Sequence, residues 1–152
     1  MPRGYRNNNP LNIRRSASRW EGLCPLQTDL KFCQFESMEY GWRAAFCLLT
    51  LTYYHKYCLH TIRGIISRWA PPEENPTEAY IKHVSGIVGI GPDECLGHPS
   101  EHPARWQLLG AAMATHENGM KPDWRPMLRG WELARGNSTE LGLCKVGLFL
   151  SS

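Results

Sequence analysis

Apolar residues in the middle of the chain recur every three or four positions, and this spacing predicts helices. The longest predicted helix starts after Ser37, a residue type that caps helix N-termini, and runs to about Tyr57. It should be central to the core, with an inward face made of Trp42, Ala45, Phe46, Leu49 and Tyr53. A shorter helix is predicted from Thr61 to the Pro71-Pro72 pair, because proline does not continue a helix.

Three further helices have recognisable ends. In the first of them, Asn75 is predicted as the N-cap, Pro76 as the first helical residue and Glu78 as the third. Gly89 is predicted to end this helix. The next predicted helix spans 103–118, and Gly119 follows it as a typical C-terminal glycine. A last helix is predicted over about 126–135.

The two ends of the chain lack helical periodicity. Residues 1–36 contain turn-forming asparagine, glycine and proline, and two short stretches, 11–14 and 32–35, are predicted strands that pair as a small hairpin. The tail, 138–152, is predicted as an edge strand or as a cover for the core. The predicted fold is therefore mainly α (α+β), in one domain that spans residues 1–152.

Length and composition agree with a single folded domain. The chain has 152 residues, of which 42% are hydrophobic, enough to build one core. No apolar run approaches the length of a membrane-spanning helix, and no apolar stretch follows the charged N-terminus, so neither a membrane span nor a secretory signal peptide is predicted. A substrate outside the cytoplasm would then require that the protein be delivered to it.

The net charge is +3, and its distribution is uneven. The arginines that precede Glu21, the first acidic residue, are Arg3, Arg6, Arg14, Arg15 and Arg19. This basic segment either faces an anionic polymer or is a solvated surface on which the charges cluster by chance.

The six cysteines form no Cys-x-x-Cys pair, and without a sign of secretion they are predicted to be mostly buried small hydrophobic residues. Cys95, His98 and His102 have a spacing that could bind zinc, but prolines intervene and a fourth ligand is not evident. We therefore predict no metal site and no cofactor.

Glu117 is the residue whose position suggests chemistry. It ends a strongly apolar helix, where the negative end of the helix dipole and partial burial both favour the protonated carboxylic acid. A glycosidase needs such an acid, still protonated near neutral pH, to donate to the leaving oxygen. On position alone, the alternative is that Glu117 only caps a loop.

Segment 111–122 resembles the catalytic helix of the lysozyme-like superfamily. In that superfamily an alanine-rich helix ends in Glu-Ser-Gly or a similar motif, and the glutamate is the catalytic acid. Glu117 occupies the glutamate position, while Asn118 stands where serine is common. The resemblance implies that Glu117 is the acid of a glycosidase.

A second resemblance lies nearer the start of the chain. Segments 9–14, 20–22 and 32–37 resemble, in this order, three motifs of autolysin-type glucosaminidases of the same superfamily: Asn-Leu-Phe-Gly-Ile-Lys, Trp-x-Gly and Phe-Arg-x-Tyr-x-Ser. In those enzymes the glutamate helix precedes these motifs, whereas here it follows them by about a hundred residues. A circular permutation is the simplest account, and permutation is tolerated where chain ends lie close together.

The chain also resembles a group of phage and prophage proteins over about residues 3–119, with the clearest similarity near its start and in segment 68–75. Some proteins of this group are described as virion structural proteins and others as cell-wall lytic enzymes.

Together these resemblances imply a peptidoglycan-cleaving glycosidase (a muramidase, a glucosaminidase or a lytic transglycosylase) that uses Glu117 as its general acid. The candidates for a second acid are Asp29, Glu36, Glu73 and Glu74. Glu36 is preferred because it directly follows the predicted strand 32–35, where the resemblance to lysozyme-like folds implies a second acid. A transglycosylase needs only one acid, since a hydroxyl of its own substrate closes the ring. The residues predicted to line a sugar groove are Asn12, Trp20, Phe35, Trp69, Tyr80 and Asn118. The aromatic rings could instead pack in the core, and the asparagines could hold turns.

Three alternatives stay open: a catalytically inactive virion protein with the same fold, a nucleic-acid-binding module built on the basic segment, and a serine or cysteine hydrolase. The modest charge without a basic recognition helix disfavours the second, and the lack of a nucleophile motif disfavours the third. The expected partners are bacterial peptidoglycan and either an immunity protein or virion components, with no nucleic acid. The protein is expected to be made in the cytoplasm and to reach the cell wall through a phage particle, lysis or a secretion system.

Overall fold

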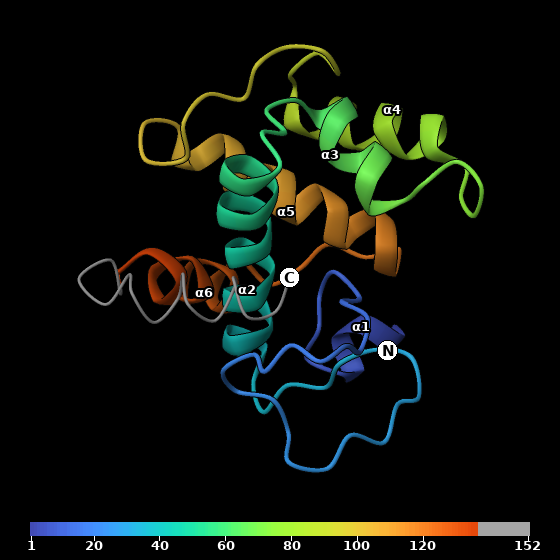
Figure 1. Cartoon of the computed structure of the whole chain (residues 1–152), viewed down its shortest axis with the longest axis vertical. Coiled ribbons are helices and arrows are strands. Elements are labelled where there is room, and N and C mark those ends of the chain that lie inside the picture. The colour runs from blue at the N-terminus through green and yellow to red at the C-terminus, as the bar shows by residue number, and fades with distance from the viewer. Residues whose placement is uncertain (137–152) are drawn as a thin grey trace.

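A computed structural model describes residues 1–136, and the predictions for the tail lie outside them. The chain is mainly helical, as the periodicity predicts (Figure 1). The helices, in chain order, are α1 (Arg3–Arg6), α2 (Met38–Cys47), η1 (Leu48–Lys56), α3 (Ile62–Trp69), α4 (Thr77–Val88), α5 (Pro103–Asn118) and α6 (Trp124–Gly136).

The long central helix starts where the sequence predicts, because the Ser37 hydroxyl accepts a hydrogen bond from the backbone N–H of Tyr40. Its second half, however, is a π-helix, η1, and not a continued α-helix. The Thr50 hydroxyl donates to the carbonyl oxygen of Phe46 at 2.7 Å and competes with the backbone for it. At the end of η1 the N–H of Tyr57 bonds to the carbonyl of Thr52, five residues back, as in a π-helix.

The other helix boundaries follow their caps. The Thr61 hydroxyl accepts from the N–H of Gly64, and Gly89 and Gly119 close α4 and α5 with positive φ values of 77° and 70°. One prediction is wrong by a residue: α4 is capped by Pro76 rather than by Asn75. The Asn75 amide donates instead to the carbonyl oxygen of Pro71, so it holds the preceding loop.

The predicted β-hairpin is wrong. Residues 11–14 and 32–35 do approach each other, but the ladder is reduced to single antiparallel bridges between Arg14 and Phe32 and between Leu23 and Phe35. The reason is that side chains take the backbone groups that a ladder would use. The buried Asn9 amide donates to two carbonyl oxygens, those of Ile13 and Cys33, and its own oxygen accepts the N–H of Ile13.

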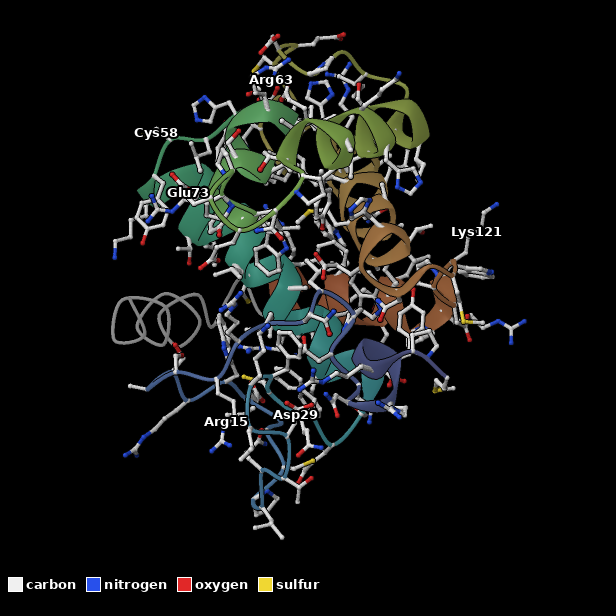
Figure 2. The ribbon with its side chains drawn as sticks, turned by 90° about the vertical axis from the view of Figure 1, so that its right-hand side faces the viewer. Arg15, Asp29, Cys58, Arg63, Glu73 and Lys121 are labelled. Carbon is white, nitrogen blue, oxygen red and sulfur yellow. The ribbon has the colours of Figure 1, made fainter. Side chains whose placement is uncertain are left out.

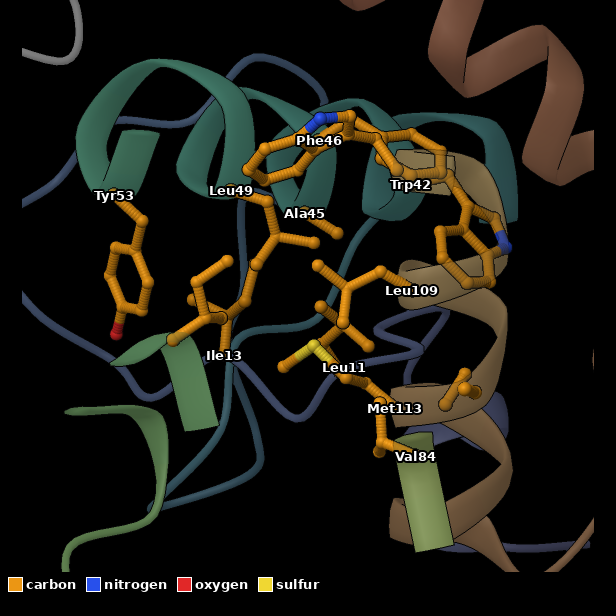
Figure 3. Packing of buried hydrophobic residues seen from close by; sticks show 14 of the residues in the cluster. Leu11, Ile13, Trp42, Ala45, Phe46, Leu49, Tyr53, Val84, Leu109 and Met113 are labelled. Carbon is orange, nitrogen blue, oxygen red and sulfur yellow. The ribbon is translucent and has the colours of Figure 1, made fainter. Parts of the chain in front are cut away.

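The core surrounds α2, where Trp42 and Phe46 are fully buried and stack with ring centroids 5.3 Å apart (Figure 3). Helix α6 packs closely on α2 because Gly130 has no side chain; a Cβ there would lie 2.3 Å from the Cβ of Trp42. Leu11 and Ile13 enter the same core from the N-terminal segment.

This packing places three parts of the chain around the end of α5. In Figure 1, α3 and α4 lie on one side of that end, and the first 36 residues lie on the other. Among the described residues, no helix is long and apolar enough to cross a membrane.

Candidate functional site

A cleft of about 370 Å³ opens between these parts of the chain. The N-terminal segment forms one wall, the π-helix and the end of α3 form the other, and the last turn of α5 contributes an acid. The lining residues are Leu11, Asn12, Ile13, Arg14, Lys31, Phe32, Leu48, Tyr53, Trp69, Ala70, Asn75 and Glu117. Glu117 is the one carboxylate among them.

The Glu117 carboxylate is half-buried and accepts hydrogen bonds from three side chains. The Asn12 amide donates to Oε1 at 3.1 Å. The Tyr80 hydroxyl donates to Oε2 at 2.9 Å, and the Trp69 indole N–H donates to the same oxygen at 3.4 Å. The carboxylate therefore has a defined orientation, set by residues 37 to 105 positions away in the chain.

Each donor is itself held by its local structure. Asn12 has a left-handed backbone, with φ of 54°, a conformation that asparagine tolerates better than most residues. Trp69 is the last residue of α3, and its ring meets that of Tyr53 with centroids 6.3 Å apart. Tyr80 lies on α4 and is buried, so its hydroxyl has Glu117 as its partner.

Tyr80 connects Glu117 to a pair of histidines. The ring of His116 stacks on Tyr80 with centroids 3.7 Å apart, and its Nδ1 lies 2.9 Å from Nδ1 of His83. Burial, followed by the charge of Glu117, raises the pKa of Tyr80 far above its usual range, so the hydroxyl keeps its proton and stays a donor. Burial, and then the neighbouring His83, lower the pKa of His116, while Glu117 opposes this.

The chemistry available in the cleft follows from these contacts. A carboxylate oxygen can accept two hydrogen bonds. Among the described residues, Oε1 accepts one, from Asn12, so it keeps a free lone pair or proton position. Phe32, Tyr53 and Trp69 supply aromatic surface in the same cleft, on which an apolar face of a ligand can lie. The site can thus hold a partly apolar ligand beside one acid.

Four of the residues predicted from the sequence meet here. Glu117, Asn12 and Trp69 line the cleft. Tyr80 is outside the cleft lining and donates a hydrogen bond to Glu117. Asn12 is predicted to line a groove that binds sugar. In the structure its amide donates to Glu117 instead of pointing to where a ligand would bind.

The other predicted residues lie elsewhere. Phe35 is fully buried in the core, because alternation turned it inward, and Trp20 is partly buried against the same core, outside the cleft lining. The Asn118 amide donates to the carbonyl oxygens of Pro10 and Ala114, so it ties α5 to the N-terminal segment. Glu36 is exposed and outside the cleft lining.

Sequence reasoning missed several lining residues, above all Tyr53, Phe32 and Asn75. The sequence predicts Tyr53 on the inward face of the long helix, and the structure places it there. Helical periodicity does not distinguish a core from a cleft, because both are on the inward face. In segment 32–35 side chains alternate between buried and less buried, and Phe32 is on the opposite side from buried Cys33. This alternation could have predicted that Phe32 lies outside the core.

The cysteines match their prediction in part. Cys33 and Cys47 are buried, but Cys58 and Cys95 are exposed, and no disulfide joins the cysteines among residues 1–136. In that part of the chain no group of three histidine, cysteine or acidic side chains lies close enough to hold a metal ion.

The chain is similar to Protein P5 of Pseudoalteromonas phage PM2. The two are 43% identical over 123 residues, which is 79% of this chain and 73% of the phage protein. No protein-family model matches the chain.

Proposed function

This chain belongs to the family of Protein P5 of Pseudoalteromonas phage PM2, and from that premise we propose that it is a phage enzyme that cleaves the glycan strands of bacterial peptidoglycan. The observation that carries the proposal is the position of Glu117, which is the one carboxylate among the residues of 1–136 that line an aromatic cleft and is oriented by Asn12, Trp69 and Tyr80.

In the proposed reaction, a proton on Glu117 passes to the glycosidic oxygen as the bond from that oxygen to the sugar C1 breaks. Oε1 is the better placed oxygen, since Oε2 already accepts from both Tyr80 and Trp69. C1, which carries the positive charge, is then attacked by water or by the substrate's own C6 hydroxyl, either directly or after the substrate's N-acetyl oxygen has closed a ring on C1 that the water or hydroxyl opens. Glu117, now a carboxylate, takes the proton that the attacking water or hydroxyl loses.

The fold that we propose is lysozyme-like and circularly permuted. Its support is that the glutamate at the end of α5 lines one cleft together with Asn12 and Phe32, which come from two of the N-terminal motif segments. A permuted chain needs this proximity, because motifs that are separate in sequence must meet in space.

A second candidate function is that of a virion structural protein without activity. It is favoured by the observation that the donors to Glu117 come from three separate parts of the chain, so that Glu117 links α3, α4 and α5 with the N-terminal segment. As an enzyme, the protein would reach the cell wall within a phage particle or at lysis.

The test compares wild-type protein with Glu117→Gln on purified sacculi. The amide keeps the shape of the side chain, so folding should be retained within about 1 kcal/mol. Loss of the proton donor should lower the rate by roughly 10² to 10⁴. Glu101→Gln is the matched control, because Glu101 is exposed and outside the cleft.

Mass spectrometry of the products separates the possible bonds and nucleophiles, since anhydro-muramic, reducing muramic and reducing glucosamine ends differ. Wild-type protein that leaves strands intact, or a folded Glu117→Gln variant with full activity, would favour the structural role. Loss of activity in Glu36→Gln would point to a two-carboxylate mechanism in place of the one proposed.

A further inference from the structure

Two cations at the edge of the cleft have no part in the acid chemistry proposed above. Arg14 and Lys31 line the cleft, and both side chains are exposed. Their backbones are joined, because Arg14 bridges to Phe32 and the N–H of Arg15 donates to the carbonyl oxygen of Lys31 at 2.9 Å. We call Arg14 and Lys31 the cationic lip.

The charges around the cationic lip leave it available to a ligand. Arg3 is bound to Asp29 through two hydrogen bonds of 2.8 and 2.7 Å. Asp29 also accepts the backbone N–H of Lys31 at 2.9 Å, but its ion pair among the described residues is with Arg3 and not with the Lys31 ammonium. Arg14 faces Glu74 across the cleft at 3.7 Å, but the side chains are 64% and 63% exposed, which makes this a weak pair. Lys31 lies over the Phe32 ring at 5.1 Å and makes no ion pair with the described residues.

We infer that the cationic lip binds the carboxylates that muramic acid residues carry in peptidoglycan. This inference rests on the proposed function, since it concerns a strand bound beside Glu117. The sugar rings themselves are uncharged, and their acidic groups are the lactyl carboxylate or, where a stem peptide is attached, the carboxylates of that peptide. Arginine offers a carboxylate a planar pair of donors, and lysine adds a point charge.

The geometry explains why the charge lies at the edge and not deep in the cleft. The Phe32 ring is already contacted by Arg3 at 4.6 Å and by Lys31 at 5.1 Å. A strand that places its sugar rings against Tyr53 and Trp69 therefore leaves its lactyl groups at the cleft mouth, beside Lys31. There a substrate carboxylate replaces Glu74 as the partner of Arg14. Figure 2 labels Arg15 and Glu73, which are the chain neighbours of Arg14 and Glu74. They lie on the lower and upper parts of one side of the molecule, and Lys121 lies on the opposite side.

The experiment uses three forms of the same glycan strands: peptide-bearing strands, peptide-free strands that keep the lactyl carboxylate, and strands whose carboxylates have been chemically amidated. Arg14→Gln and Lys31→Gln should each raise KM for the carboxylate-bearing strands by roughly two- to fivefold, as expected for exposed charge pairs, and leave kcat unchanged. Glu74→Gln should lower KM. Lys121→Gln, the matched control outside the cleft, should change neither.

Amidated strands should give a raised KM with wild-type protein and no further change in the variants. An effect confined to peptide-bearing strands assigns the contact to the stem peptide, and an effect on both charged forms assigns it to the lactyl group. Equal KM values for charged and amidated strands, or variants that behave as wild type on every form, would overturn the inference.

Binding is measured separately, by co-sedimentation of wild type, Arg14→Gln and Lys31→Gln with insoluble sacculi, before and after amidation. If no form of the strands is cleaved, the proposed function fails. Sedimentation that still depends on both cations and on the carboxylates would then uphold the cationic lip as a binding site, and sedimentation independent of them would reject it.

Discussion

At the residue scale, the contacts of Glu117 are the main feature of the cleft. Its two oxygens are held by an amide, an indole and a phenol, from three separate segments. Tyr80 is the most constrained donor, because it is buried, bonded to Glu117 at 2.9 Å and stacked on His116. In the proposed reaction Tyr80 is therefore a positioning residue, which acts through Glu117.

We expect Tyr80→Phe to lower kcat by roughly 10- to 100-fold, because a hydrogen bond to a charged group contributes about 1.5–3 kcal/mol and each 1.4 kcal/mol is a factor of ten. KM should change little, since Tyr80 does not line the cleft. Kinetics on peptidoglycan strands check this, with Tyr57→Phe as the control outside the cleft. A rise in KM without loss of kcat would contradict the positioning role.

Asn12 combines a contact and a backbone conformation, and two substitutions separate them. Asn12→Gly and Asn12→Ala both remove the donor to Glu117, so both should lower activity. The glycine variant should be the more stable by about 1 kcal/mol, because glycine adopts a φ of 54° without strain. Thermal melting measures the difference, and equal stabilities would show that the backbone conformation relaxes.

At the element scale, two glycines in helices have opposite reasons to be there. Gly130 on α6 faces α2, where a Cβ would lie 2.3 Å from the Cβ of Trp42 and 2.9 Å from the N of Arg43. Gly86 on α4 is exposed, and a Cβ there would meet nothing within 4 Å. The first glycine sets how closely two helices approach, whereas the second only lowers helix stability.

We therefore expect Gly130→Ala to destabilise the protein by about 1–3 kcal/mol, through overpacking that α2 and α6 relieve only by separating. Gly86→Ala should stabilise it by about 0.5–1 kcal/mol, the ordinary difference in helix propensity. Denaturant unfolding of both variants measures these changes. A Gly130→Ala variant as stable as wild type would mean that the α2–α6 contact is looser than described.

At the scale of the whole molecule, the stability should depend on pH in two separate ranges. The folded state lowers the pKa of His116 below its unfolded value of about 6.5, so His116 contributes stability above that pH and the contribution is lost as the pH falls. The groups that face His116 are Tyr80, His83 and Glu117. Asp29 acts in the same direction at lower pH: Arg3, followed by backbone N–H groups, holds the pKa of Asp29 well below its usual range.

We expect the melting temperature to fall between about pH 7 and pH 5, and again below about pH 4. His116→Gln should flatten the first fall and leave the second, and Asp29→Asn should do the reverse. Melting curves across pH check this. A first fall that persists unchanged in His116→Gln would show that another group causes it.

Some of this protein is determined by its sequence alone. The mainly α class, the N-caps at Ser37 and Thr61 and the C-terminal glycines 89 and 119 depend on residues a few positions apart, and they are found as predicted. The position of Glu117 between an apolar helix and a glycine made it a candidate, and the resemblance of segment 111–122 to a catalytic helix singled it out; its role as an acid stays a prediction.

The tertiary structure decided the rest, because it depends on contacts between distant residues. The Asn9 amide replaced the predicted hairpin with a side-chain network, and the Thr50 hydroxyl accompanies the change from α- to π-helix. Phe35 and Tyr53 both face inward from their own segments, yet one is in the core and the other lines the cleft. What an inward face meets is set by the packing of the other segments, and no local pattern of the chain contains that information.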